Sequence, residues 1–487
     1  MTPQFEAPQF EAPQLGAPQL GAPEAFGARR SPAMWNGFAN MASLAAGGVV
    51  TITGGEGSTV FDAGGRSYLD ALASLWYCNI GHGRAAMADA AAAQMRQIAA
   101  YQVFETFSNR PAEALARRVS DLAPIPDAKV FFTPGGGSDA IDTAAKLARA
   151  YWRAVGQPTR QVVIGRSHAY HGVNAYGTSL SGIPANTEAF SPLVPLVERV
   201  PWDDAAALEK IIGQVGASRV AAFFCEPVVG AGGVYFPPEG YLARVQEICR
   251  EQDVLFVADE VITGFGRLGS WFASERFALE PDMMTVAKGL TSGYAPLGAV
   301  LVGPRVAEPF WRPGSAEIFR HGYTYQAHPT ACAVGLANLD ILEREQLVPR
   351  VRELEGVLAA KLSPLADHEL VGEVRTGTGL LAAVEIAAEA RAADPGLAAR
   401  LVARIREYGV ITRLLRGVAL QISPPFVITE AEIGQIATVF AAALDDAARS
   451  TKGLGERSNP HRGPSEFRAG KAAMGAGRLA PSGGVMA

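Results

Sequence analysis

Short, continuous apolar runs that alternate with amphipathic segments constrain the fold of this chain more than any other feature. There are six such runs: KVFF (129–132), QVVIG (161–165), VAAFFCE (220–226), VLFVADE (254–260), MMTVA (283–287) and GAVLVG (298–303). Helical patterns such as Tyr241–Glu251 lie between several of them. Continuous apolar strands that alternate with helices are typical of a largely parallel sheet buried on both faces, so we expect an α/β domain.

A polar or glycine-rich group directly follows five of the six runs. In chain order these groups are Gly135–Ser138, the segment RSHAYHG (166–172), Glu226, Asp259 with Glu260, and Lys288. In open α/β sheets the ligand binds beyond the carboxyl ends of the strands. A purely structural sheet would have ordinary turns at some of these positions, so the pattern predicts one shared active site.

The segment TPGGGSD (133–139) joins a strand to a helix through three glycines. Such a loop is typical of an anion cradle, because backbone amides and the Ser138 hydroxyl can face the ligand. No GK[ST] follows, which argues against a P-loop, and the loop does not spell GxGxxG. The alternative is a tight turn in which Ser138 caps the helix and no ligand is required.

Lys288 stands between an apolar run and a Gly/Pro-rich loop, with no further charge until Arg305. Burial of this kind lowers the pKa of an ammonium group and makes the amine nucleophilic. A lysine that extends from a strand end to solvent is the alternative. Asp259 ends another run, where a buried carboxylate needs a cationic partner: a protonated pyridine nitrogen or an arginine such as Arg267. Tyr170 offers a flat face for ring stacking, or it packs in the core.

An anion cradle, an aromatic face, a buried carboxylate and a desolvated lysine together describe one ligand. It carries a phosphate, an aromatic ring, a basic ring nitrogen and an electrophilic carbonyl, and pyridoxal 5′-phosphate has all four. The lysine would hold the aldehyde covalently, and the aspartate would keep the ring nitrogen protonated.

Over residues 35–445 the chain resembles the class III pyridoxal-phosphate aminotransferases of fold type I, the ω-amino-acid or amine:pyruvate type. The motifs that carry the resemblance are, in order, LWYCNIGHG, GGGSDAIDTAAKLAR, HAYHG, CEPVVGAGGVYFPP, VADEVITGFGR, VAKGLTSGYAPLGA, HGYTYQAHP and SPPFVIT. The resemblance implies a large domain with a mostly parallel seven-stranded sheet flanked by helices. It also implies a smaller α+β domain built from both chain ends.

We expect five parts along the chain. A Pro/Gln-rich pentapeptide repeat makes 1–30 a disordered tail, and 449–487 is also expected to be disordered because it is rich in Gly, Pro, Ser and Arg. Between the tails we expect an N-terminal segment of the small domain at 31–76, the large cofactor-binding domain at 77–338 and the C-terminal small domain at 339–448.

Carried over by position, the resemblance implies a role for each motif residue. Lys288 is the catalytic Schiff-base lysine, and Asp259 partners the pyridine nitrogen. Val261 packs on the ring face opposite Tyr170, and the HAYHG segment also brings His171 to the cofactor. The remaining cofactor-binding residues are the phosphate-binding Gly136, Gly137 and Ser138, Glu226 near the phenolic oxygen, and Thr324, which reaches the phosphate of the neighbouring subunit. Thr324 thus implies a homodimer, or a tetramer. The phosphate loop is one residue longer than the common family pattern, which leaves open which glycine amides touch the phosphate.

The resemblance also implies a substrate pocket. An arginine before the double proline binds the substrate carboxylate in the family, and here Arg413 and Arg416 are both candidates, with Arg413 favoured; either could instead pair with a surface acid. Trp76 and Phe104, with Tyr77 beside Trp76, are expected to line the pocket, and core packing is the rival interpretation.

The predicted activity is ping-pong transfer of an amino group from an ω-amino acid, a diamine or a primary amine to an α-keto acid, with pyruvate favoured. Within the family the alternatives are an aminomutase or a decarboxylase. Outside it, the chain could be a non-catalytic cofactor-binding homologue or a nucleotide-binding protein that uses the glycine loop. The physiological donor, the acceptor and the pathway stay open.

Net charge and composition limit the classes of partner and the cellular compartment that we expect. The 487 residues carry a formal net charge of -5, which gives no electrostatic footprint for nucleic acid or an anionic membrane. No apolar run approaches the roughly 20 residues that span a bilayer, and the N-terminus lacks the pattern of a signal peptide. Four scattered cysteines and the histidines show no metal-ligand spacing, so we expect a cytoplasmic protein without a metal site.

Overall fold

The computed structural model describes residues 33–457, with side chains up to residue 450. The expected tail at 1–30 and the part of the expected tail beyond 457 lie outside the described residues. Helix α15 (Glu430–Arg457) continues nine residues past the expected boundary at 448. Its amphipathic start packs against the small domain, and nothing in the backbone interrupts it there.

By contacts the described residues form two compact units, 33–54 with Val60–Ser67 and Gly55–Thr59 with 68–457. The first unit contains α1 (Met41–Gly47) and most of β1 (Ile52–Glu56) and β2 (Thr59–Asp62). Asn40 caps α1 by accepting a hydrogen bond from the Ser43 amide at 3.0 Å. These units do not coincide with the domains expected at 31–76, 77–338 and 339–448, which stay predictions.

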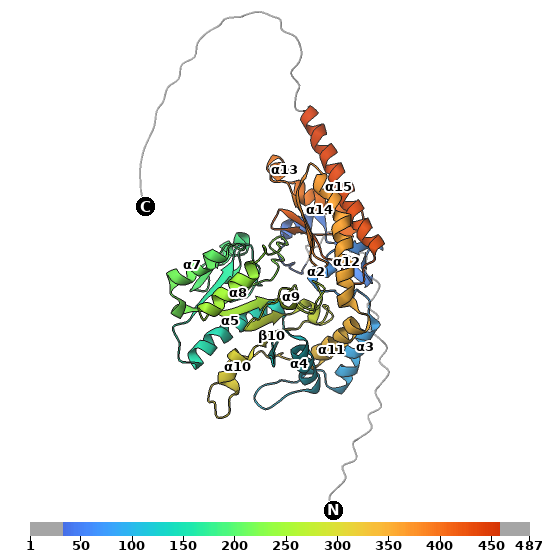
Figure 1. Ribbon diagram of the computed structural model, residues 1–487. Helices are drawn as coiled ribbons and strands as arrows, with labels where there is room; N and C mark the ends of the chain where they lie inside the picture. The colour runs from blue at the N-terminus through green and yellow to red at the C-terminus, as the bar shows by residue number, and fades with distance from the viewer. Residues whose placement is uncertain (1–32, 458–487) are drawn as a thin grey trace, which may run out of the picture. The chain divides into compact units, whose positions relative to one another are not determined.

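A seven-stranded sheet organises the second unit, as expected (Figure 1). In spatial order its strands are β4 (Lys129–Thr133), β10 (Gly298–Val302), β9 (Met283–Val286), β8 (Leu255–Asp259), β7 (Val220–Cys225), β5 (Val162–Arg166) and β6 (Val197–Val200). Only β10 runs antiparallel to its neighbours, so the other six share one direction. All six apolar runs of the sequence form strands of this sheet.

Helices cover both faces of the sheet, because alternate residues of each strand point to opposite faces and both sets are apolar. Ala222 and Phe224 of β7 face α5 (Gly137–Ala154), whereas Phe223 and Cys225 face the other side. There α7 (Ala205–Val215) and α8 (Tyr241–Glu251) bury their apolar faces. The remaining helices of this layer structure are α3 (Ala85–Gln97), α4 (Arg110–Leu122), α6 (Ala175–Leu180), α9 (Ala273–Arg276), α10 (Pro304–Trp311) and α11 (Pro329–Arg344).

A smaller antiparallel sheet follows in the C-terminal part of the chain. Its strand order is β11 (Val371–Arg375), β12 (Ala382–Ile386), β15 (Ala419–Ile422) and β14 (Leu414–Leu415). Helices α12 (Leu347–Leu362), α14 (Leu397–Glu407) and α15 pack together beside it, and α13 (Ala388–Ala393) precedes α14 (Figure 1). Strand β13 (Val410–Ile411) pairs in parallel with β3 (Ser67–Asp70) through Leu69 and Asp70. The start and the C-terminal part of the second unit therefore lie side by side here.

The strand directions decide where a site can form. Strands β4, β5, β7, β8 and β9 all end at the same edge of the large sheet, which brings the residues that follow them together. None of the helices in residues 33–457 is both long enough and apolar enough to cross a bilayer.

Candidate active site

The glycine loop after β4 forms an anion cradle at the start of α5. Gly136 has φ of +107°, which a side chain would disfavour, and α5 begins at Gly137 without a side-chain cap. The first-turn amides of an α-helix have no partner inside the helix and carry its positive dipole end. Ser138 Oγ accepts a hydrogen bond from the Val173 amide at 3.1 Å, so its own proton is free for a ligand.

The extra residue of this loop has a structural use. The Gly135 amide donates to Asp139 Oδ2 at 2.8 Å, and Asn174 Nδ2 donates to Asp139 Oδ1 at 2.8 Å. Gly135 is therefore occupied by the carboxylate of Asp139. The amides of Gly136, Gly137 and Ser138 are left to face an anion, and their role in phosphate binding stays a prediction.

Two glycines around the cradle, Gly137 and Gly172, have no room for a side chain. A Cβ on Gly137 would lie 2.6 Å from Cγ1 of Val261, and one on Gly172 would lie 2.5 Å from Ser138 Oγ. Val261 thus packs directly on the start of α5. The closest atom to a Cβ on Gly136 would be the Cβ of Ala287, at 3.9 Å, so the loop lies beside the residue that precedes Lys288.

Asp259, at the end of β8, is buried and accepts three hydrogen bonds. Its Oδ2 accepts from His171 Nδ1 at 2.7 Å, and its Oδ1 accepts from Thr285 Oγ1 and from the Val261 amide, each at 3.1 Å. His171 is 1% exposed and its Nε2 has no hydrogen-bond partner among the described residues. The carboxylate is therefore held in one orientation by three groups.

Arg267, the other cation considered for Asp259 from the sequence, lies elsewhere. It is fully buried, and its guanidinium donates to the carbonyl oxygen of Pro424 at 2.7 Å and to Asn79 Oδ1 at 2.7 Å. Burial lowers the pKa of Arg267 to about 9. This arginine ties the large domain to the segment after β15, and it is not the partner of Asp259.

Glu226, after β7, positions the aromatic face. Its Oε1 accepts from the Tyr170 amide at 3.0 Å and its Oε2 accepts from the Gly230 amide at 2.9 Å. Burial, with the nearby Asp259 carboxylate, raises the pKa of Glu226 against the opposing effect of His171. Both carboxyl oxygens therefore accept hydrogen bonds from backbone amides. The expected role of Glu226 near the phenolic oxygen of the cofactor stays a prediction.

Lys288 follows β9 directly and opens a short 3-10 helix, Lys288–Leu290. Burial lowers the pKa of its ammonium group from 10.5 to about 8, against the opposing effect of the Asp259 and Glu226 carboxylates. An amine with this pKa is partly neutral near pH 7 to 8 and can act as a nucleophile or a base.

Arg413, which precedes β14, reaches this group of residues. Burial is the main cause of the lowered pKa of Lys288, and the positive charge of the Arg413 guanidinium lowers this pKa further. Burial raises the pKa of Tyr170, and the Arg413 guanidinium opposes that rise. Within the described residues the Arg413 guanidinium has no hydrogen bond and no ion pair. Arg416 instead donates to the carbonyl oxygen of Gly232 at 3.3 Å.

The expected pocket residues take different positions. Trp76 is 2% exposed and packs in a core cluster with Val228 and Ile262, so its ring is a core side chain in this chain. Phe104 is 46% exposed, and its ring lies 3.0 Å from the position of a Cβ on Gly322. Thr324 is also exposed, in the turn between α10 and α11.

Sequence reasoning missed two supporting residues of this site. Thr285 donates to Asp259, and Asp139 orders the glycine loop. A signal existed for Thr285, since it is the single hydroxyl within the apolar run MMTVA, on the strand that leads to Lys288.

The geometry fits pyridoxal phosphate. The cradle of free amides suits its phosphate, the hydrogen-bonded Asp259 suits its ring nitrogen, Val261 and Tyr170 suit its two ring faces, and the low-pKa amine of Lys288 suits its aldehyde. A sheet of this topology with these groups at its carboxyl edge defines a pyridoxal-phosphate-dependent enzyme of fold type I.

Comparison with known proteins narrows the class to one family. The family profile Aminotransferase class-III matches residues 43–444. Putrescine–pyruvate aminotransferase of Pseudomonas aeruginosa is 40% identical over 423 residues, 82% of this chain and 91% of that protein. Beta-alanine–pyruvate aminotransferase of the same organism is 38% identical over 419 residues, 82% of this chain and 92% of that protein. The omega transaminase from Pseudomonas jessenii, solved in complex with PMP, matches with a TM-score of 0.80 at 34% identity, over 86% of this chain and 97% of that one. The chain belongs to the class-III aminotransferases and is a pyridoxal-phosphate-dependent transaminase.

Proposed function

We propose that this transaminase moves the amino group of a diamine, an ω-amino acid or another primary amine onto pyruvate, in two half-reactions at one site. The observation that carries the proposal is the unpaired guanidinium of Arg413 beside Tyr170 and Lys288. Such a cation can bind the carboxylate of a keto acid with two parallel hydrogen bonds. Two relatives, a putrescine–pyruvate and a beta-alanine–pyruvate aminotransferase, support the substrate class.

An enzyme of this kind must accept one substrate with a carboxylate and another without it. Arg413 has no ion pair among the described residues, so moving it aside breaks no existing salt bridge. Its long flexible stem lets the charge approach pyruvate and withdraw from an uncharged amine substituent. Arg416, whose guanidinium is tied to the Gly232 carbonyl, is the less mobile of the two.

The remaining residues take the chemical roles. Bound pyridoxal phosphate supplies an aldehyde that joins amines covalently and a protonated ring that accepts electrons. Lys288 removes the proton from the substrate carbon that bears the amino group and returns it as the acid, which its lowered pKa permits near neutral pH. Asp259, fixed by His171 and Thr285, holds the proton on the ring nitrogen.

A donor and acceptor panel tests the proposal. The purified holoenzyme is mixed with putrescine, β-alanine or an arylalkylamine, and loss of the visible cofactor band is followed. The band is then restored with pyruvate or with 2-oxoglutarate. Faster recovery with pyruvate, by at least about ten-fold, is expected, since each ten-fold corresponds to about 1.4 kcal/mol. A band that no donor bleaches, or that only 2-oxoglutarate restores, contradicts the proposal.

Arg413→Ala separates the carboxylate role from a structural one. The variant should lose most of its activity with pyruvate and keep the bleaching rate with an arylalkylamine that has no carboxylate. The matched control is Arg416→Ala. Equal losses in both half-reactions of the Arg413 variant would rule out the carboxylate role.

For assembly and compartment, we propose a cytoplasmic homodimer in which Thr324 completes the phosphate site of the neighbouring subunit. Thr324 is exposed in the single chain, as such a residue must be before the partner binds. All four cysteines are buried free thiols, which suits a reducing compartment.

A further inference from the structure

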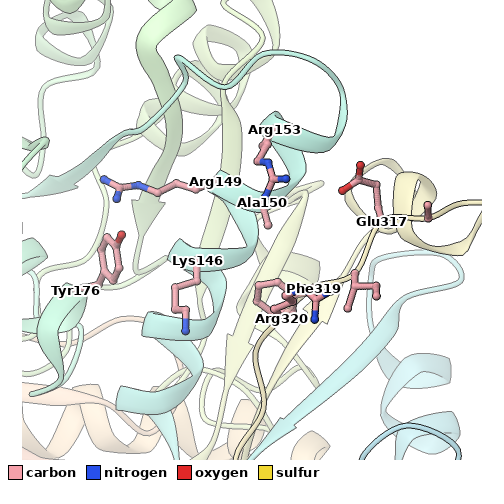
Figure 2. Close-up of a pocket in the computed structure, with 10 residues that line it drawn as sticks. Lys146, Arg149, Ala150, Arg153, Tyr176, Glu317, Phe319 and Arg320 are labelled. Atoms are coloured by element: carbon pink, nitrogen blue, oxygen red, sulfur yellow. The ribbon is translucent and has the colours of Figure 1, made fainter.

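A hollow of about 480 Å³ lies between α5 and the segment Ala316–Arg320, away from the residues of the active site. Figure 2 shows Lys146, Arg149 and Arg153 projecting from α5 and Glu317, Phe319 and Arg320 from the facing segment. The volume falls in the range of small-molecule sites. Spacings of three and four residues place the three cations of α5 on one face of the helix.

The charge of this lining is strongly one-sided. Lys146, Arg149, Arg153 and Arg320 contribute four positive charges and Glu317 one negative charge, a balance of three positive charges in a chain whose formal net charge is -5. None of the four cations forms an ion pair with any residue in 33–450. Crowding like charges without ion pairs to acids opposes stability unless an anion is bound there.

Three other surface arginines of this chain are paired with acids. Arg118 pairs with Asp340 and Glu343, and Arg244 pairs with three glutamates within reach of its guanidinium. Arg305 likewise pairs with Asp253 and Asp282. The four cations of the hollow, by contrast, have no acid within ion-pair distance among residues 33–450.

Two of the cations are already fixed in position. Arg149 Nε donates to the Gln161 carbonyl oxygen at 2.9 Å, and its guanidinium lies 5.2 Å from the ring centre of Tyr176. Its Nη2 is shielded from solvent and has no hydrogen-bond partner in the described part of the chain. Lys146 Nζ donates to Nδ1 of His321 at 2.8 Å. A buried donor without a partner is unfavourable, and a bound anion would satisfy it.

We infer that this basic hollow is a second binding site, separate from the cofactor site, for a phosphorylated small molecule that carries at least two negative charges. Donors reach the hollow from α5, from α6 through Tyr176 and from Ala316–Arg320, which suits a tetrahedral group with several oxygens better than a planar carboxylate. The rings of Tyr176 and Phe319 supply flat apolar walls for the remainder of such a molecule.

Binding of simple anions to the holoenzyme tests the site. Pyrophosphate and ATP are titrated calorimetrically into protein whose cofactor is in place, and the visible cofactor band is recorded in the same samples. We expect saturable binding that weakens as salt rises, with an unchanged band, because the phosphate loop stays occupied. No binding of either anion, or binding only with loss of the band, would overturn the inference.

Arg153→Gln with Arg320→Gln removes two exposed cations that have no partner in the structure, so the fold should persist. Binding of pyrophosphate should fall by at least about ten-fold, because charge-assisted hydrogen bonds are lost. The matched control is Arg117→Gln with Lys210→Gln, which removes the same charge elsewhere and should change binding less than about two-fold. Arg153→Lys with Arg320→Lys should retain most of the affinity.

Two further measurements complete the test. Transamination without added anion should be the same in both double glutamine variants and in the wild type. Hydrogen exchange in 316–320 should slow when pyrophosphate binds, since this segment forms one wall of the hollow. If the Arg153→Gln/Arg320→Gln variant binds pyrophosphate as tightly as the wild type, the hollow is an ordinary surface and not an anion site. If this variant alone sediments as a smaller species, the hollow is a contact between copies of the chain and not an anion site.

Discussion

Lys288 occupies a backbone conformation that few lysines adopt. Its φ is +43°, at the junction between β9 and the short 3-10 helix. A non-glycine residue in such a region costs about 1–3 kcal/mol and persists only where the surroundings enforce it. Gly289 contributes to this, since a Cβ there would lie 2.6 Å from Asn79 Nδ2. The surrounding structure therefore fixes the backbone conformation from which the Lys288 side chain extends.

The lowered pKa of Lys288 gives a pH prediction for capture of the cofactor. Only the neutral amine attacks an aldehyde, so in apoenzyme the capture rate should rise with pH with a midpoint near pH 8 and then level off. Stopped-flow absorbance after mixing apoenzyme with pyridoxal phosphate at a series of pH values measures this rate. A midpoint near 10.5, the ordinary value for lysine, would show that burial does not act on this amine.

Glu226→Gln tests whether this buried carboxylate positions Tyr170. A glutamine has one acceptor oxygen for the two amides that Glu226 binds, so one buried N–H loses its partner, at a cost of about 1–3 kcal/mol. Thermal unfolding of the holoenzyme should show a lower Tm. Glu247→Gln, which removes an exposed partner of Arg244, is the control and should change stability by less than about 1 kcal/mol. Equal stability of the two variants would contradict the positioning role.

Single residues differ in how far the sequence predicts them. Asp259 and Lys288 are predictable because each is a charge placed directly at the end of an apolar run. The side chain that hydrogen-bonds to Asp259 is not predictable in this way. Arg267 is close to Asp259 in sequence but lies elsewhere, and His171, which forms the hydrogen bond, is distant in sequence. Only the pairing of β5, β7 and β8 brings the His171 loop to the end of β8.

At the scale of elements, the junction of the glycine loop with α5 is the most tightly constrained feature of the site. Gly137→Ala would drive a methyl group to 2.6 Å from Val261, so either the helix start or the ring-facing valine must shift. We expect the Kd for pyridoxal phosphate to rise by at least about ten-fold, which corresponds to about 1.4 kcal/mol. Titration of apoenzyme with the cofactor, followed by absorbance, measures it.

Gly213→Ala is the control for that substitution. Gly213 lies in α7, and a Cβ there would have no atom within 4 Å. Alanine should leave cofactor binding unchanged and raise stability by up to about 1 kcal/mol, because glycine is a poor helix former. An unchanged Kd in the Gly137 variant would mean that the cradle tolerates a side chain.

The long apolar strands could be predicted from the sequence, and the short elements could not. All six runs became strands of the large sheet, because a fully buried strand must be apolar on both sides. Strand β6 was missed, since its Glu198 and Arg199 break the run at the sheet edge. Trp76 lies in a helical turn whose backbone is kinked at Ser74 and Leu75, and this kink directs the indole into the core. No local pattern encodes that direction.

At the scale of the whole molecule, several exposed apolar side chains suggest a surface that is covered in the assembled protein. They include Phe104 (46%), whose ring lies beside Gly322, Phe107 (49%) and Tyr325 (66%). Tyr325 neighbours Thr324, the residue proposed to act on the partner's site. Exposed apolar residues near one proposed contact residue are typical of a subunit interface.

Mixed dimers test the proposed exchange of Thr324 between subunits. Lys288→Ala removes the amine of its own site, and Thr324→Glu places a negative charge against the phosphate of whichever site Thr324 serves. Each variant alone should be nearly inactive. In a dimer of the two, the subunit that keeps Lys288 receives an intact Thr324 from its partner, so one of the two sites is complete.

Co-expression with two different tags should therefore restore activity in material that is purified through both tags, to about half the wild-type value per dimer. If Thr324 instead served its own subunit, one site would lack Lys288 and the other would carry the repelling glutamate, and the mixed dimer would stay inactive. A matched mixture of Lys288→Ala with wild type separates simple dilution from complementation. This control dimer should also reach about half the wild-type activity, because Thr324 is intact in both subunits and only one subunit has Lys288.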